Sequence, residues 1–461
     1  MKESITVQEE MQSVVSDHAT LVAIGLKIQE LRLLDPIEEK VQIAQKTIKY
    51  EPYEKLIDGL IAILAGAHGL AEINKLVRGD SALQAAFGRD GCAEQSVVQD
   101  TLDHCTAENV EQMQQAVQEI YRQHSQGYRH DFGQLLVLDI DLTGRPCGKK
   151  AALATKGYFG GRPNRRGRQV AYVVASQYEE VVVERLFQGN VALTTALPSL
   201  LQGTEETLIL AARERARTIL RIDAGGGSVE AINEMLSKGY HIHCKDYSGM
   251  RARKLAASVT EWVEDPREPG RQVGWVTTEP DLYLRPVRRI AARCRKRNGQ
   301  WGVGVIVSSL SDPEILALTG ASPEAAQAPH ASLLAHVHFY DQRGGGVEIA
   351  IKQDKQGLGT LKRNKKRFEA QQMVLQLEAL AHNLIFWSRA WLATGCAKIV
   401  RWGLLRMVRD VFRMLGIIKF DHTHRIVQII IRQTDPLAKP LSVSLATILA
   451  QQQVTVILGE I

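Results

Sequence analysis

The stretch LLVLDIDLTG, residues 135–144, has the pattern of a buried β-strand with acidic side chains near its end. In the two-residue alternation of a strand, one face carries Asp139 and Asp141, while the other face is apolar throughout (Leu136, Leu138, Ile140 and Leu142). A buried carboxylate needs a partner or a metal ion to offset its loss of hydration. Residues 219–223 form a second apolar strand pattern that also ends in an acid, Asp223. Two strands that end in aspartate predict a shared cation site.

Length and composition predict a globular protein with several domains. The 461 residues are 45% apolar and 23% charged, which is enough for two to four buried cores. The sequence has no run of about 18 uncharged apolar residues and no apolar segment near its start, so we expect neither a membrane span nor a signal peptide. The expected location is therefore the cytoplasm. Six scattered cysteines without CxxC spacing disfavour both a zinc site and a disulfide framework.

Charge is distributed unevenly along the chain. Residues 1–130 contain 12 Lys/Arg and 20 Asp/Glu, whereas residues 131–461 contain 45 Lys/Arg and 31 Asp/Glu. A basic excess of this kind is typical of proteins that bind polyanions, although a merely solvated basic surface has the same composition. We therefore expect a nucleic-acid surface on the later part of the chain.

Sequence patterns divide the chain into five segments. Residues 1–130 have helical spacing of apolar residues, with capping boxes predicted at Ser81 with Gln84 and at Ser96 with Gln99. This all-helical segment is either a simple packing module or, given the turns at Gly79-Asp80 and 88–91, a helix-turn-helix module. Strands alternate with helices in residues 131–245 and 336–410, which predicts a mixed α/β sheet interrupted by a β-rich insertion at 246–335. No role is predicted for residues 411–461.

Two basic segments are candidates for contact with nucleic acid. A glycine-rich connection after Asp141 contains Arg165 and Arg166. Within the insertion, Asn298-Gly299 is a strong hairpin signal, and the first arm is rich in arginine, including Arg288 and Arg289. Such a ribbon either contacts a phosphate backbone or protects an exposed sheet edge with charge.

A third acid follows a segment, residues 333–340, that we expect to be a strand. If a helix begins near Val347, then Glu348, Lys352 and Lys355 share one helical face. That face can offer a carboxylate to a metal and lysines to phosphates, or it can be a solvated stripe of ion pairs. Together with Asp141 and Asp223, Glu348 would complete an all-oxygen site suited to Mg²⁺ or Mn²⁺. Two such ions can support in-line attack on a phosphodiester.

These motifs resemble the DDE transposases of bacterial insertion sequences, in the branch whose third acid lies in a Tyr, Arg, Glu, Lys pattern. The match consists of Asp141 followed by Thr143, of Asp223, and of a third motif (Tyr340, Arg343, Glu348 and Lys355). The resemblance implies an RNase H-like core and two divalent metal ions held by the three acids. It also implies phosphate contacts from Arg343 and Lys355, and a packing or hydrogen-bonding role for Tyr340 near the DNA end. The implied activity is binding of terminal inverted repeats, strand cleavage and strand transfer, with a homodimer acting on paired ends.

Several alternatives stay open at this point. Asp139 lies on the same strand face as Asp141 and is the rival metal ligand. Four residues, 344–347, separate Arg343 from Glu348, where this branch usually has three. An extra glycine is either absorbed before the helix or rotates Glu348 out of the site. The nearest rival enzyme is an RNase H-like nuclease without strand transfer. The extra glycine motivates a second rival, a non-catalytic DNA-binding derivative.

Overall fold

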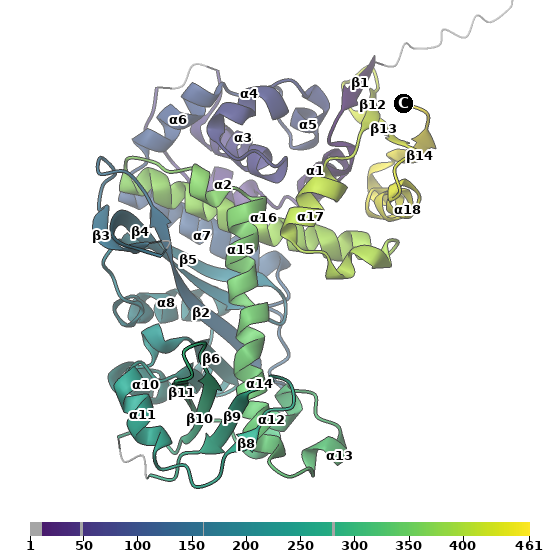
Figure 1. The fold of residues 1–461 in the computed structure, drawn as a ribbon. Helices are drawn as coiled ribbons and strands as arrows, with labels where there is room; N and C mark the ends of the chain where they lie inside the picture. Colours follow the sequence, from purple (N-terminus) through teal and green to yellow (C-terminus); the bar gives the residue numbers. More distant parts are fainter. Residues whose placement is uncertain (1–11, 47–48, 160, 279–281) are drawn as a thin grey trace, which may run out of the picture. The chain divides into compact units, whose positions relative to one another are not determined.

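The computed structural model describes residues 12–46, 49–159, 161–278 and 282–461 (Figure 1). These residues form two compact units. The first unit comprises the described residues up to Ser125 together with Lys150–Ala152 and Lys352–Ile461. The second comprises Gln126–Lys149 and Leu153–Ile351. Each unit is therefore assembled from segments that lie far apart in the sequence.

A ten-stranded mixed sheet is the framework of the second unit. Its main path runs in the order β3-β4-β2-β6-β7-β11-β10-β9-β8, and β5 pairs with β4. The three central strands β2, β6 and β7 are parallel, whereas β4 and β11 run antiparallel to them on either side. The bounds are β2 (Leu136–Pro146), β3 (Thr155–Phe159), β4 (Arg162–Ala175), β5 (Glu180–Gln188), β6 (Thr218–Ile222), β7 (His241–Lys245), β8 (Val263–Glu264), β9 (Arg271–Trp275), β10 (Arg288–Arg295) and β11 (Trp301–Ser308).

Helices of the second unit bury the apolar side chains of this sheet. Phe339 of α14 packs with Val137 and Ile219 of the central strands, and Leu333 and Val337 pack against β9, β10 and β11. This burial fixes α14 above the strands that carry the predicted acids. The helices are α8 (Leu193–Leu208), α9 (Ala212–Arg215), α10 (Val229–Ser237), α11 (Gly249–Ala256), α12 (Asp312–Leu318), α13 (Pro323–Ala326), α14 (Ala331–Gly345) and α15 (Val347–Gly357), the last of which continues into the first unit.

The first unit is mainly helical, and α16 (Phe368–Ala393) is its longest helix. Most side chains of α16 are buried around its whole circumference, which is typical of a helix enclosed by others. A four-stranded sheet adds β1 (Gln12–Ser16), β12 (Gly416–Phe420), β13 (Ile426–Arg432) and β14 (Thr455–Gly459). The other helices are α1 (Ala19–Glu30), α2 (Asp35–Lys40), α3 (Pro52–Leu64), α4 (Ile73–Leu76), α5 (Ser81–Ala86), α6 (Gln95–His104), α7 (Ala107–His124), α17 (Leu404–Arg406) and α18 (Ala438–Ile448).

The predicted mixed α/β class is confirmed, with two local corrections. Residues 333–340, expected as a strand, belong to helix α14. The two capping boxes are wrong, because Asp80 caps α5 through the amide of Leu83, and α6 begins after Glu94. The division into five segments and the RNase H-like arrangement stay predictions. No described helix is long and apolar enough to cross a lipid bilayer.

Candidate active site at the carboxyl edge of the central strands

Asp141 and Asp223 lie at the same edge of the sheet. Strands β2 and β6 are parallel, with Asp139 paired to Arg221 and Ile140 paired to Ile222. The next residue after each member of the last pair is an aspartate, so Asp141 on β2 and Asp223 just after β6 lie side by side where the pairing of the two strands ends. Strand β2 continues beyond this point to Pro146, paired with β4. This is the edge where we predicted the two carboxylates.

The glycine run after Asp223 permits a close turn at this edge. The Asp223 Oδ1 atom accepts a hydrogen bond from the Gly225 amide at 2.8 Å and caps a short 3₁₀ turn. A Cβ atom on Gly227 would lie 1.9 Å from the carbonyl oxygen of Lys245, so only glycine fits there. The glycines therefore let the turn pack against β7.

Arg343 connects two of the three predicted acids. Its Nη2 atom lies 3.1 Å from Asp141 Oδ1, and its Nη1 atom lies 3.0 Å from Glu348 Oε1. The same Nη2 donates to the carbonyl of Ile140 at 3.1 Å. Arg343 is 3% exposed and sits in the last turns of α14, whereas Glu348 is exposed in the first turn of α15. One buried guanidinium thus holds both carboxylates beside the edge.

Burial and neighbouring charges shift the pKa values of titratable side chains at this edge. Burial raises the pKa of Asp141 above its ordinary value; Arg343 opposes that rise, and the charge of Asp223 adds to it. Burial likewise raises the pKa of Tyr340 to about 12, so its hydroxyl stays protonated at neutral pH. A cation near Asp141 and Asp223 would relieve their repulsion.

Gly346 sets the position of Glu348. It is the residue between α14 and α15, and a Cβ atom there would lie 2.5 Å from Asp139 Oδ2 and 3.1 Å from Ser176 Oγ. The chain therefore approaches β2 closely at the start of α15. By contrast, a Cβ on Gly344 or Gly345 would meet no described atom within 4 Å. The helix does begin at Val347, as predicted.

Asp139 is held in a buried network of hydrogen bonds. It is fully buried, and Arg221 reaches both of its oxygens, with Nε at 2.5 Å from Oδ1 and Nη2 at 2.8 Å from Oδ2. The Ser176 hydroxyl donates to Oδ2 as well. Arg221 also donates to the carbonyl of Phe339 at 2.6 Å, which ties α14 to the sheet. This geometry favours Asp141 over Asp139 as a metal ligand.

The donor set suits a divalent cation only in part. Asp141 and Asp223 supply oxygen ligands at neighbouring positions where the β2–β6 pairing ends, and their mutual repulsion is the property that a cation offsets. Within the described ranges, no group of three or more His, Cys, Asp or Glu side chains is close enough to hold a metal. Glu348 is paired with Arg343 at 3.0 Å.

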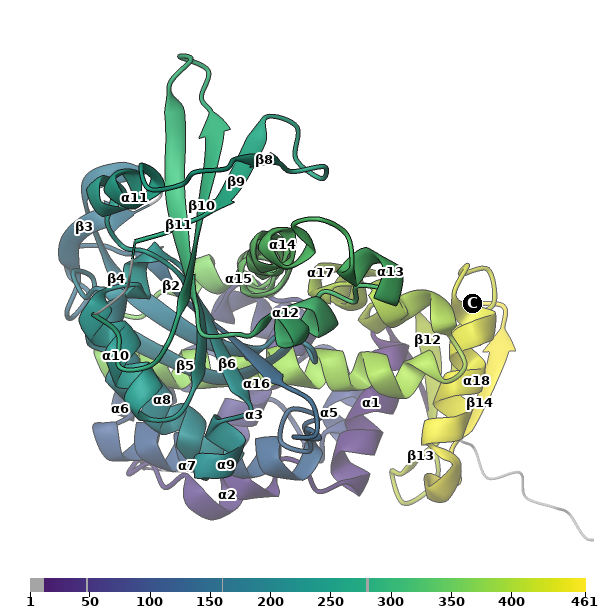
Figure 2. The same ribbon diagram turned by 90° about the horizontal axis from the view of Figure 1, so that it is seen from below.

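Two basic hairpins extend past the acidic edge. Asp141 pairs with Tyr172, and β4 continues through seven more residues to Arg165, roughly 23 Å along the strand. On the other side, Lys245 pairs with Ile306, and β11 continues to Trp301, roughly 16 Å further. Figure 2 shows β10 and β11 extending beyond α11 and α14. Both hairpins thus project on the side where Asp141 and Asp223 lie.

The predicted DNA-contacting residues are in different surroundings. Arg165 and Arg166 are exposed on the β3–β4 hairpin. Arg288 is exposed but paired with Asp312 at 2.6 Å, and Arg289 is buried and donates to the carbonyl of Thr278. Both lie at the base of the β10–β11 hairpin, since Arg288 pairs with Ser308.

The basic arm and turn predicted for that hairpin also include Arg295, Lys296 and Arg297. These three side chains are exposed at its tip, next to the Asn298-Gly299 turn. Lys352 is exposed and Lys355 half-buried further along α15, in the first unit.

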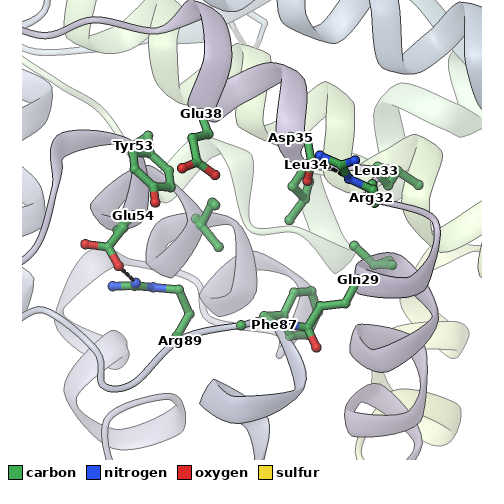
Figure 3. Close-up of a pocket in the computed structure, with 13 residues that line it drawn as sticks. Gln29, Arg32, Leu33, Leu34, Asp35, Glu38, Tyr53, Glu54, Phe87 and Arg89 are labelled. Carbon is green, nitrogen blue, oxygen red and sulfur yellow. Dashed lines mark hydrogen bonds and ion pairs between the residues drawn. The ribbon is translucent and has the colours of Figure 1, made fainter. Parts of the chain in front are cut away.

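A separate pocket of about 250 Å³ lies in the first unit (Figure 3). It is lined by Tyr53, Glu54, Phe87 and Arg89, among others, and by none of the predicted site residues. Arg89 is already paired with Glu54 and Asp58. The pocket therefore has no part in the candidate active site.

Comparison with known proteins places the chain in a family. Residues 1–407 match the family model described as transposase DDE domain, group 1, so the chain belongs to the DDE transposases of this group. A solved structure titled as the piggyBac transposase synaptic complex with hairpin DNA is similar at 11% sequence identity and a TM-score of 0.42. That similarity covers 86% of this chain and 80% of the other. No curated protein matches the chain.

Proposed function

We propose that this chain binds the terminal inverted repeats of an insertion sequence, cleaves DNA strands there and joins the ends to target DNA. Membership of the DDE transposase family supports the general activity. The observation that supports the site is that Asp141 and Asp223 directly follow the last paired residues of the adjacent parallel strands β2 and β6, with Glu348 linked to Asp141 through Arg343. An RNase H-like core is part of the same proposal.

In this proposal Asp141, Asp223 and Glu348 hold Mg²⁺ or Mn²⁺. When bound, such ions activate a water or a 3′-hydroxyl and stabilise the leaving oxygen of the phosphodiester. The protein's own groups orient the reactants. Arg343 fixes two of the carboxylates. Tyr340, which stays protonated, is available as a hydrogen-bond donor close to Arg343.

The DNA lies across the acidic edge, between the two basic hairpins. Arg165 and Arg166 on one side and residues 295–297 on the other neutralise phosphates. We retain Arg288 as a further phosphate contact, because it is exposed, and Lys352 because it continues the α15 surface. The burial of Arg289 argues against a direct contact from that residue.

Cleavage and joining assays test this function. The substrates are duplexes taken from the DNA on either side of the gene, incubated with Mg²⁺ or Mn²⁺. We expect Asp141→Asn, Asp223→Asn and Glu348→Gln each to abolish cleavage while binding to the same duplexes persists. Full cleavage by any one variant would remove that residue from the site.

The assays also separate the rival functions. A nuclease without strand transfer would cleave but yield no joined product from pre-cut ends. A non-catalytic derivative would bind the ends and cleave nothing with either metal. The pairing of Glu348 with Arg343, away from a three-carboxylate cluster, is the observation that favours this second rival.

A further inference from the structure

Four large apolar side chains are exposed on two neighbouring segments of the second unit. Met250 is 80% exposed and Tyr247 54%, at the start of α11. Leu284 is 65% exposed and Leu282 55%, in the connection before β10. Single exposed apolar residues are ordinary, but a group of them marks an interaction surface.

The backbone beneath these side chains is held firmly. The buried Asp246 accepts a hydrogen bond from the Ser248 amide at 3.1 Å and pairs with Arg251 at 3.3 Å. Arg251 in turn donates to the Tyr283 hydroxyl at 2.9 Å, which joins the two segments. Asn233 of α10 binds the carbonyl of Leu282 at 2.9 Å and the amide of Leu284 at 3.0 Å. The exposed side chains are therefore carried on an ordered base.

The helix that carries Met250 is also anchored to the sheet. Ala252 and Ala256 of α11 pack against Ala291 of β10 and Val305 of β11. This face of α11 is buried, so the exposure of Met250 is not a consequence of a detached helix.

This surface borders the acidic edge. Strand β7 is the parallel neighbour of β6. Tyr247 lies just after the end of β7, and the turn that begins with Asp223 lies just after the end of β6, so both lie at the same edge of the sheet. A Cβ atom on Gly227, in the turn that begins with Asp223, would lie 3.2 Å from the Tyr247 amide nitrogen. An occupant of the surface therefore lies beside the proposed reaction centre.

The charges around the surface favour a polyanion. Lys245, Arg253 and Lys254 are exposed next to Tyr247 and Met250 in the chain. Apolar side chains surrounded by cations match a nucleic-acid duplex, in which phosphates enclose stacked bases. A purely apolar protein partner would leave these cations without counter-charges.

We propose that Tyr247 and Met250 form a wedge that enters the base stack of the target duplex next to the joining site. The wedge rests on the proposed function and deepens it. Met250 has no hydrogen-bond donor for base edges and Tyr247 has a single hydroxyl beside its apolar ring, so this surface responds more to how easily the duplex deforms than to its sequence. That property suits target DNA, whose sequence varies, better than the fixed terminal repeats.

Strand transfer into two targets tests the wedge. Pre-cut ends, taken from the DNA beside the gene, are joined to a fully paired duplex or to the same duplex with a tandem mismatch at its centre. In this proposal the wedge unstacks the paired target so that the duplex can bend into the site, and the double variant Tyr247→Ala/Met250→Ala lacks that wedge. The double variant should therefore join the paired target at least about tenfold more slowly than the unchanged protein. The mismatched target, already unstacked, should restore joining to within about twofold. Val443→Ala, which removes another exposed apolar side chain, is the control and should join both targets normally.

The outcomes separate the wedge from the proposed function. If the unchanged protein neither cleaves nor joins, the proposed function fails. If it does both, and the double variant joins the paired target at full rate, the wedge is overturned. Slow joining that the mismatch does not restore would also overturn it, as would an equal loss in hydrolytic cleavage of the ends.

Discussion

Replacing Asp139 by alanine should destabilise the protein far more than replacing Asp141 by asparagine. Asp139 is fully buried and forms two hydrogen bonds with Arg221, which is itself 2% exposed. Without Asp139 a buried guanidinium loses its counter-charge, and water does not reach it. The two acids of one strand thus have different surroundings.

The size of the effect follows from the type of interaction. Removing one partner of a buried ion pair costs about 3–5 kcal/mol of unfolding free energy. For Asp141 the contribution of the charged side chain to the unfolding free energy has the opposite sign, because burial raises the pKa of Asp141 and the folded state disfavours its charged form. Asp141→Asn should therefore change the unfolding free energy by less than about 1 kcal/mol, or increase it.

Urea unfolding at pH 7 measures both changes, with a double variant as the control. Arg221→Met alone should also be costly, since it leaves Asp139 charged and buried. The double variant Asp139→Ala/Arg221→Met should cost at least about 2 kcal/mol less than the sum of the single variants.

Two results would refute this reasoning. One is an Asp139→Ala protein as stable as the original, and the other is an Asp141→Asn protein as unstable as Asp139→Ala. Either would mean that the two carboxylates do not have the separate environments described above.

Three further predictions concern the helix junction, a buried histidine and the long hairpin. Gly346→Ala should cost about 1–3 kcal/mol and reduce DNA cleavage, because its Cβ would meet Asp139 Oδ2, whereas the control Gly345→Ala should be neutral or stabilising. Burial lowers the pKa of His336 from 6.5 to about 4, so the folded state binds fewer protons than the unfolded state between these pH values. The unfolding free energy should therefore fall by roughly 3 kcal/mol as the pH is lowered from 6.5 to 4. His336→Leu should flatten that pH dependence in urea titrations. Alanine at residues 295–297 should lower the salt dependence of duplex binding by about 1 to 3 in the log–log slope, as measured by fluorescence anisotropy.

Each of these has a clear contrary result. Equal behaviour of the two glycine variants would mean that the junction does not approach β2 closely. A pH dependence unchanged by His336→Leu would assign acid sensitivity to other groups. An unchanged salt slope would exclude the hairpin tip from phosphate contact.

The sequence predicted those features that depend on local patterns. Alternation in residues 135–144 identified β2, and the Asn298-Gly299 turn, with Gly299 at φ +77°, identified the β10–β11 hairpin. The condition under which Glu348 and Lys352 share a helical face, a helix start near Val347, is met.

Features that depend on distant partners were not predictable in this way. Asp139 and Asp141 share a strand face, and only the position of Arg221, 82 residues away, distinguishes them. Arg288 and Arg289 are adjacent in sequence, but pairing with β11 and contact with Thr278 bury only the second. Residues 333–340 are rich in strand-prone side chains, yet Leu333, Val337 and Tyr340 pack at helical spacing against the sheet. Tertiary packing overrode local propensity there.

Iron-directed cleavage of the protein itself tests the central claim most directly. Fe²⁺ replaces Mg²⁺ in the presence of end DNA, and ascorbate with peroxide then generates radicals that cut the polypeptide close to the bound ion. Convergence of the three acids predicts cuts near residues 141, 223 and 348 together, all suppressed by excess Mg²⁺ and by Asp223→Asn. Cuts near 141 and 223 that never extend to 348, or no cuts at these positions, would contradict the account.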